Sequence, residues 1–164
     1  IQPALAMERV ILELLLRDPE QLHPLNRHLQ EAGLARLDVQ DFEATVHQIL
    51  ARLILDSLQQ DEMEAFQYIA MNSSDEAEKT LDEYAAADVH GEPSTETAFV
   101  QLYRTVLRLR EWTIRQNLEQ IRFMKLENEE EAGGVGNMDD KMVADLTTLR
   151  NRITRALNRQ VLSV

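Results

Sequence analysis

The feature of this sequence that most constrains its fold is a run of about 37 residues, ending near Ala132, without glycine or proline. Ser94 or Thr95 precedes it and is a suitable N-cap, so the run predicts one long helix. At 1.5 Å per residue such a helix spans roughly 55 Å. A compact bundle of 164 residues cannot cover a helix of that length, and we therefore expect part of it to project.

The apolar pattern along this predicted helix changes near Trp112. A helix that is apolar on several sides is buried, whereas a helix with one narrow stripe faces one partner. We therefore expect the helix to leave the body of the protein near Trp112. The first half is apolar on several sides (Phe99, Val100, Leu102, Tyr103, Val106, Leu107 and Leu109), and the second half has a stripe (Ile114, Leu118 and Ile121).

The segment that follows supplies the partner for this stripe. Between the two lies LENEEEAGGVGNMDDK, residues 126–141, whose glycines allow the backbone to reverse and whose Asn137 and aspartates favour the start of a new helix. The two helices are thus predicted to form an antiparallel hairpin. Apolar residues in the returning segment recur at spacings of three and four, as in a coiled-coil seam: Met142, Leu146, Leu149, Ile153 and Ala156 with Leu157.

The rest of the chain also has helical periodicity, so the predicted fold class is all-α. We expect a helical bundle subdomain at residues 1–95 and a projecting antiparallel helical hairpin at residues 96–164, with a linker from Asp88 to Ser94. The predicted helices of the bundle run from about Ala4 to Leu16, from Pro19 to a C-cap at Gly33, from an N-cap at Asp38 to Leu58, from Asp61 to Met71, and onward from a cap at Ser73 or Ser74.

Composition excludes several classes of function. The net charge is −12, which disfavours nucleic acid as the main partner because phosphates are bound by Lys and Arg. Residues 1–95 carry a net charge of −13, whereas residues 96–164 carry +1 and are rich in arginine. The absence of cysteine excludes disulfides and thiolate zinc sites, and no apolar run approaches the roughly 20 residues of a membrane span.

Motifs for catalysis or cofactor binding are weak. Glu20 and His23 have the spacing of a di-iron ligand pair, but that design needs a second copy of the motif, which is missing. The Gly-Gly-Val-Gly stretch lacks the strand and the Gly-Lys-Ser/Thr of a phosphate loop. We expect no cofactor, no metal and no catalytic residue in this chain.

The arginines of the second unit are more informative. They mark an outer side of both hairpin helices: Arg104, Arg108, Arg115 and Arg122 on the first, and Arg152, Arg155 and Arg159 on the second. Such residues form either a solvated face or a contact surface for an acidic or mixed partner. Val161 and Leu162 add apolar residues without an evident place in the hairpin, which favours a contact surface.

Four stretches together resemble a known family. They are ERVILELLLRDPEQL (residues 8–22), LDVQDFEATVHQIL (37–50), LREWTIRQNLEQIRF (109–123) and LTTLRNRITRALNR (146–159). Together they are similar to the C-terminal helicase-binding domain of bacterial DnaG-type primase. The first two are also similar to the amino-terminal domain of the replicative DnaB-type helicase, but the charged hairpin favours the primase.

The resemblance implies a non-catalytic module, monomeric in isolation, in the bacterial cytoplasm. It would dock onto the amino-terminal collar of the hexameric DnaB-type helicase and so couple primer synthesis by the parent primase, a DNA-directed RNA polymerase, to unwinding. Neither a membrane nor direct nucleic acid binding is expected. The residues we expect to bind the helicase are Arg152, Arg155, Leu157, Arg159, Val161 and Leu162.

Two alternatives remain open from the sequence. The chain could be the collar domain of the helicase itself, an oligomerisation module that would assemble into rings. It could also be a metal-dependent helical enzyme, which would purify with stoichiometric iron or manganese.

Overall fold

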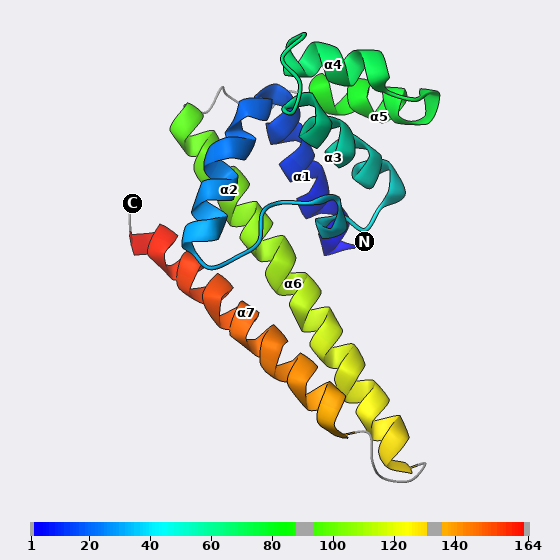
Figure 1. Ribbon diagram of the computed structural model, residues 1–164, viewed down its shortest axis with the longest axis vertical. Helices are drawn as coiled ribbons and strands as arrows, with labels where there is room; N and C mark the ends of the chain where they lie inside the picture. Colours follow the sequence, from blue (N-terminus) through cyan, green and yellow to red (C-terminus); the bar gives the residue numbers. More distant parts are fainter. Residues whose placement is uncertain (1, 88–93, 131–135, 163–164) are drawn as a thin grey trace.

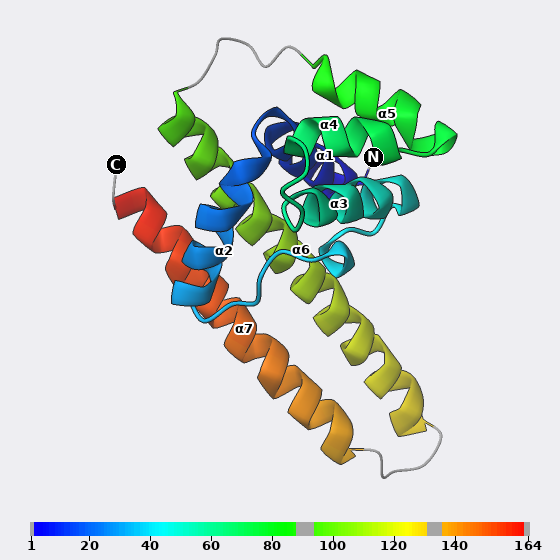
Figure 2. The ribbon, with the colours of Figure 1, turned by 45° about the horizontal axis from the view of Figure 1, so that its top comes forward.

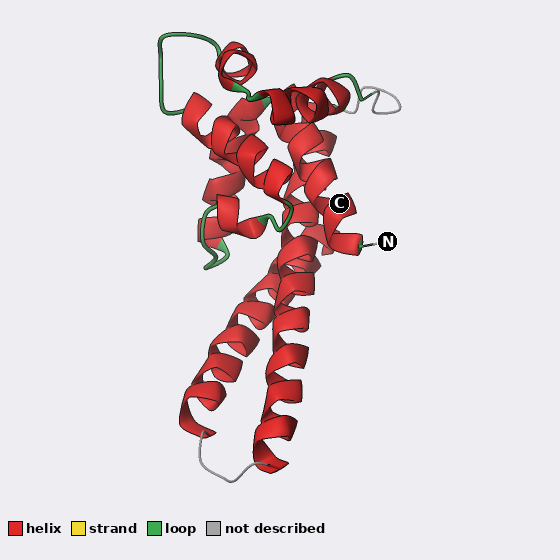
Figure 3. Cartoon of the chain, turned by 90° about the vertical axis from the view of Figure 1, so that its right-hand side faces the viewer, coloured by secondary structure: helices red, strands yellow, loops and turns green. Residues whose placement is uncertain are grey.

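The computed structural model describes residues 2–87, 94–130 and 136–162, with side chains described for 2–87, 94–127 and 140–159. Every regular element in these ranges is a helix, which confirms the all-α prediction (Figure 3). The elements are α1 (Pro3–Arg17), η1 (Pro19–Gln21), α2 (Leu22–Glu31), η2 (Val39–Asp41), α3 (Thr45–Ser57), α4 (Ala65–Asn72), α5 (Asp75–Ala85), α6 (Thr95–Glu130) and α7 (Gly136–Leu162).

The body of the protein is built around α1, which is surrounded by α3, α5 and α6. Its Ile11 and Leu12 are fully buried. The core continues without interruption into the first half of α6, where Val106 and Leu107 are also fully buried. Side chains from residues 1–95 and from residues 96–164 therefore share one hydrophobic core.

The predicted projecting hairpin is present (Figures 1 and 2). α6 has 36 residues, so it is about 54 Å long. The last of its described side chains to be buried is Ile114, close to the predicted exit point at Trp112. Beyond it α6 continues away from the body with α7 running antiparallel beside it. We call the part of α6 and α7 beyond Ile114 and before Leu149 the arm.

The hairpin differs from expectation in one respect: the second half of α7 returns to the body and does not project. Ile153 and Ala156 are buried in the core, and the C-terminal end of α7 lies near α2 and the start of α6 (Figures 1 and 2). The physical reason is that the first half of α6 is apolar on several sides. α1 and α2 cover only some of these sides, and α7 covers another.

The predicted helix from Asp38 to Leu58 is interrupted. Asp38 does act as an N-cap, but of the short η2, with a capping box formed with Asp41. The chain is then extended at Phe42 and Ala44, and α3 begins at Thr45. Similarly, α4 begins at Ala65, four residues later than predicted.

Other local predictions are confirmed. Gly33 has φ +75° and ends α2, with the Leu34 N–H donating to the Leu29 carbonyl in the pattern of a Schellman cap. Ser74 caps α5, and the Ser94 hydroxyl accepts from the Thr97 N–H at the start of α6. The linker residues 88–93 and the tip residues 131–135 lie outside the described residues.

Candidate docking surface

The residues predicted to bind a partner lie on the second half of α7, close to the body. Arg155 and Arg159 are exposed and one helical turn apart, on the side away from the buried Ile153. Within the described part of the chain neither has a salt bridge. We call Arg155, Arg159 and the neighbouring Arg152 the α7 surface.

Arg152 also contacts the body of the protein. Its Nη1 donates to the carbonyl oxygen of Gly33 at 3.0 Å, where the unpaired carbonyls at the end of α2 concentrate negative charge. A Cβ added to Gly33 would lie 3.3 Å from Cδ of Arg152. Arg152 therefore fixes α7 to the C-terminus of α2, and its guanidinium is not wholly available to a partner.

The positive charge of Arg159 affects the pKa of Tyr103, a buried residue of α6. Burial raises the pKa of the Tyr103 hydroxyl, the negative charge of Glu31 raises it further, and the positive charge of Arg159 lowers it. Arg159 thus lies near the junction of α2, α6 and α7. It extends the basic α7 surface toward the acidic body.

The apolar members of the predicted set are less accessible than expected. Leu157 is partly buried against the core, so it stabilises the contact of α7 with the body and offers only part of its side chain to a partner. α7 extends through Val161 and Leu162, but their side chains lie outside the described residues.

Arg110 is a structural residue that the sequence interpretation missed. It clamps the segment from Gly33 to Asp41, which we call the strap, onto α6. Its Nε and Nη2 donate to the Asp41 carboxylate at 2.8 and 2.9 Å, and Nη1 donates to the Ala35 carbonyl at 2.7 Å. The available signal was an arginine within the half of α6 predicted to be buried, because such a charge needs a partner.

The strap, α6 and α7 together form a groove of about 360 Å³. Leu34, Ile114 and Ile153 contribute apolar side chains to it, and Arg110 and Asp38 contribute polar ones. The ion pair with Asp41 holds the Arg110 side chain in place, so this polar part of the groove has a fixed position. It lies where the arm leaves the body and adjoins the α7 surface.

The arm carries exposed apolar side chains that were not in the predicted set. Phe123 is 65% exposed, Leu126 59%, Met124 53% and Met142 52%. Lys125 and Asp140 join the two helices here by an ion pair at 2.5 Å. Exposed apolar groups gathered at the distal part of a hairpin are typical of a protein contact surface.

A buried polar cluster connects α1, α3 and α5. Glu8 Oε1 accepts from the Glu43 and Ala44 N–H groups and lies 3.0 Å from His47 Nδ1. The Tyr84 hydroxyl lies 2.8 Å from His47 Nε2, so it donates to that nitrogen when the ring is neutral. Glu8 thereby holds the extended segment immediately before α3, and His47 is buried in the core.

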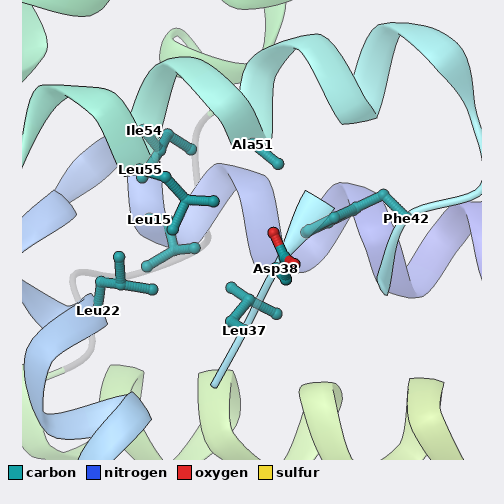
Figure 4. A pocket seen from close by; sticks show the side chains of 8 residues that line it. All are labelled: Leu15, Leu22, Leu37, Asp38, Phe42, Ala51, Ile54 and Leu55. Atoms are coloured by element: carbon teal, nitrogen blue, oxygen red, sulfur yellow. The ribbon is translucent and has the colours of Figure 1, made fainter. Parts of the chain in front are cut away.

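The cavity inside the core is too small for a ligand, and the described residues form no evident metal site. Figure 4 shows the cavity between α1, α3 and the strap; its volume is about 10 Å³, far below the several hundred Å³ of a ligand pocket. Among the residues described, no group of three or more His, Asp or Glu side chains is placed to hold a metal ion. Oε2 of Glu20 lies 3.5 Å from Nε2 of His23, but both side chains are mainly exposed.

A search of the described helices finds none with the length and apolar character needed to span a bilayer. Comparison with known proteins gives no match to a family model, to a curated protein or to a solved structure.

Proposed function

We propose that this chain is a helicase-docking module of a bacterial primase, which binds the amino-terminal collar of the hexameric DnaB-type helicase and has no active site of its own. The observation that carries the proposal is the α6–α7 hairpin, whose distal arm exposes apolar side chains while Arg155 and Arg159 lie exposed nearer the body. The resemblance of four sequence stretches supplies the identity of the partner.

The arrangement supports docking for three reasons. Arginine and exposed apolar groups are enriched at protein interfaces. The strap, held by Arg110 and Arg152, fixes the direction of the hairpin relative to the body before any partner arrives, and such preorganisation lowers the entropy lost on binding. The net charge of −12 keeps the module away from the nucleic acid on which the helicase works.

The experiment is a titration of labelled chain with the cognate hexameric helicase, followed by fluorescence anisotropy. The test variant combines Arg155→Ala with Arg159→Ala. The matched control combines Arg27→Ala with Arg52→Ala, which removes two exposed arginines from α2 and α3. We avoid truncating the chain before α7, because this would remove Ile153 and Ala156 from the core.

We expect the test variant to bind on the order of tenfold more weakly, equivalent to about 1.4 kcal/mol, and the control to bind like the parent chain. The affinity of the parent chain should fall with rising salt, and that of the test variant should fall less steeply. Absence of binding by the parent chain would disprove the proposal. Assembly of the chain alone into rings would instead identify it as the collar domain.

A further inference from the structure

The helix α4 is unusual for a surface helix because it contains no charged residue. Its sequence is AFQYIAMN, in a chain in which 28% of residues are charged. Ile69 is fully buried and attaches the helix to the body. A helix attached by one face normally presents charged or polar groups on the other, and the exposed face of α4 therefore needs an explanation.

Three of the five exposed residues of α4 are apolar, and the other two, Gln67 and Asn72, are uncharged. Phe66 is 42% exposed and Met71 is 68% exposed, and Ala70 is also exposed. Phe66 and Ala70 lie one turn apart, and Gln67 and Met71 do the same, so these four side chains form one continuous strip. We call this strip the α4 surface. Methionine adapts well to apolar partners, and both methionine and phenylalanine are enriched in interfaces.

Carboxylates flank α4 in the sequence, both before and after it. Between residues 59 and 87 the chain has eight acidic residues and one basic residue, Lys79. Arg9 lies 3.3 Å from Glu83 and offsets one of these charges. The acidic residues are Asp61, Glu62 and Glu64 before α4, and Asp75, Glu76, Glu78, Asp82 and Glu83 in α5, which lies beside α4 (Figures 1 and 2).

We infer that the α4 surface is a second docking site, and that it binds an amphipathic helix with apolar anchors on one side and Lys or Arg on its flanks. The apolar strip supplies the contact area, and the surrounding carboxylates select a basic partner. They also repel phosphates, which argues against nucleic acid and anionic membranes as partners. α4 has eight residues and is about 12 Å long, so it matches two turns of a partner helix.

This site is independent of the proposed helicase contact. α4 and α5 lie at the end of the body remote from the distal arm (Figures 1 and 2). The surfaces also differ in charge, since the α7 surface is basic and the α4 surface has an acidic rim. One chain could therefore hold two partners of opposite charge at once.

The probe for this inference is a synthetic helical peptide of about 16 residues, with Leu at positions i, i+3, i+4 and i+7 and Lys at its flanks. Its binding is measured by fluorescence anisotropy. The test variant combines Phe66→Ser with Met71→Ser. The matched control combines Phe123→Ser with Met124→Ser, which removes the same two residue types, also exposed, from the arm.

We expect saturable binding of the peptide, at least tenfold weaker binding by the test variant, and unchanged binding by the control. Replacing Glu76 and Glu78 by Gln should weaken binding and reduce its dependence on salt. All four apolar positions are at least 42% exposed, so we expect each Ser double variant to fold, with a circular dichroism spectrum like that of the parent chain.

Several results would overturn the inference. One is equal binding by the parent chain and the Phe66→Ser, Met71→Ser variant. Another is equal binding of a peptide in which Ser replaces Leu, because attraction would then be purely electrostatic. A third is a dimer in sedimentation equilibrium that this variant abolishes, which would assign the α4 surface to a second copy of the chain. Co-sedimentation with anionic vesicles would assign it to a membrane.

Discussion

Replacing Arg110 by Ala should destabilise the protein, because it removes the clamp that holds the strap on α6. The side chains of Arg110 and Asp41 are only 13% and 15% exposed. Truncating one partner of a buried ion pair costs about 3–5 kcal/mol, since the other charge stays buried. Asp41 would keep its bond from the Asp38 N–H at 2.9 Å, so we expect a loss near the lower limit, about 3 kcal/mol.

The loss can be measured as the free energy of unfolding in urea, followed by circular dichroism at 222 nm. In thermal unfolding it corresponds to a decrease in Tm of roughly 6–12 °C for a chain of this size. Arg108→Ala is the matched control. Arg108 is exposed, two residues away on the same helix, and makes no salt bridge or hydrogen bond within the described residues, so its loss should change stability by less than about 0.5 kcal/mol.

Arg110→Lys separates charge from geometry. Lysine keeps the positive charge but lacks the planar fork that contacts both oxygens of Asp41, so its stability should lie between those of the parent chain and Arg110→Ala. If Arg110→Ala unfolds at the same urea concentration as Arg108→Ala, the clamp contributes nothing and the reasoning is wrong.

Three further predictions concern the body. Glu8→Ala should cost about 3 kcal/mol in urea unfolding, because it leaves the N–H groups of Glu43 and Ala44, just before α3, and His47 without an acceptor; Glu8→Gln keeps one acceptor oxygen and should cost less, and equal losses would argue against this role of Glu8. Burial raises the pKa of Tyr103 in the folded protein, so stability should be intact below pH of about 10 and fall as pH rises through the folded pKa. Tyr103→Phe should lose less stability in that range, and an unchanged alkaline profile would contradict this. Gly33→Ala should cost about 1–3 kcal/mol, because φ is +75° and the new Cβ would crowd Arg152; Gly33→Asn, which tolerates this φ better, should lower Tm less, and the reverse order would refute the explanation.

Local periodicity and cap residues were sufficient to predict most helices, because both act over a few residues. The run without glycine or proline became α6, and Gly33 and Ser74 ended and began helices as expected. The prediction that Asp38 starts a helix reaching Leu58 was wrong, because Asp38 caps only the short η2. The interruption before α3 depends on Glu8, which lies 35 residues from Glu43 in the sequence, and no local pattern encodes that contact.

The candidate docking surface was predicted only in part for the same reason. Arginines at helical spacing indicated an exposed side, and Arg155 and Arg159 are indeed exposed. Arg152 contacts the Gly33 carbonyl, 119 residues away, and Arg110 contacts Asp41, 69 residues away. Such pairs depend on how helices pack, which periodicity does not specify. Met142 was assigned to the seam but is exposed, because a seam residue and an exposed apolar residue can have the same spacing.

The continuity of α6 has a mechanical consequence. No glycine or proline interrupts it from Thr95 to Glu130, so it has no hinge of the kind that bends helices. A force applied to Phe123 is transmitted along one backbone to Val106 and Leu107, which pack in the same core as α1. Traction by a moving partner at the distal end would load the interior of the protein directly, and resistance to unfolding under tension would be set by the packing of these few side chains.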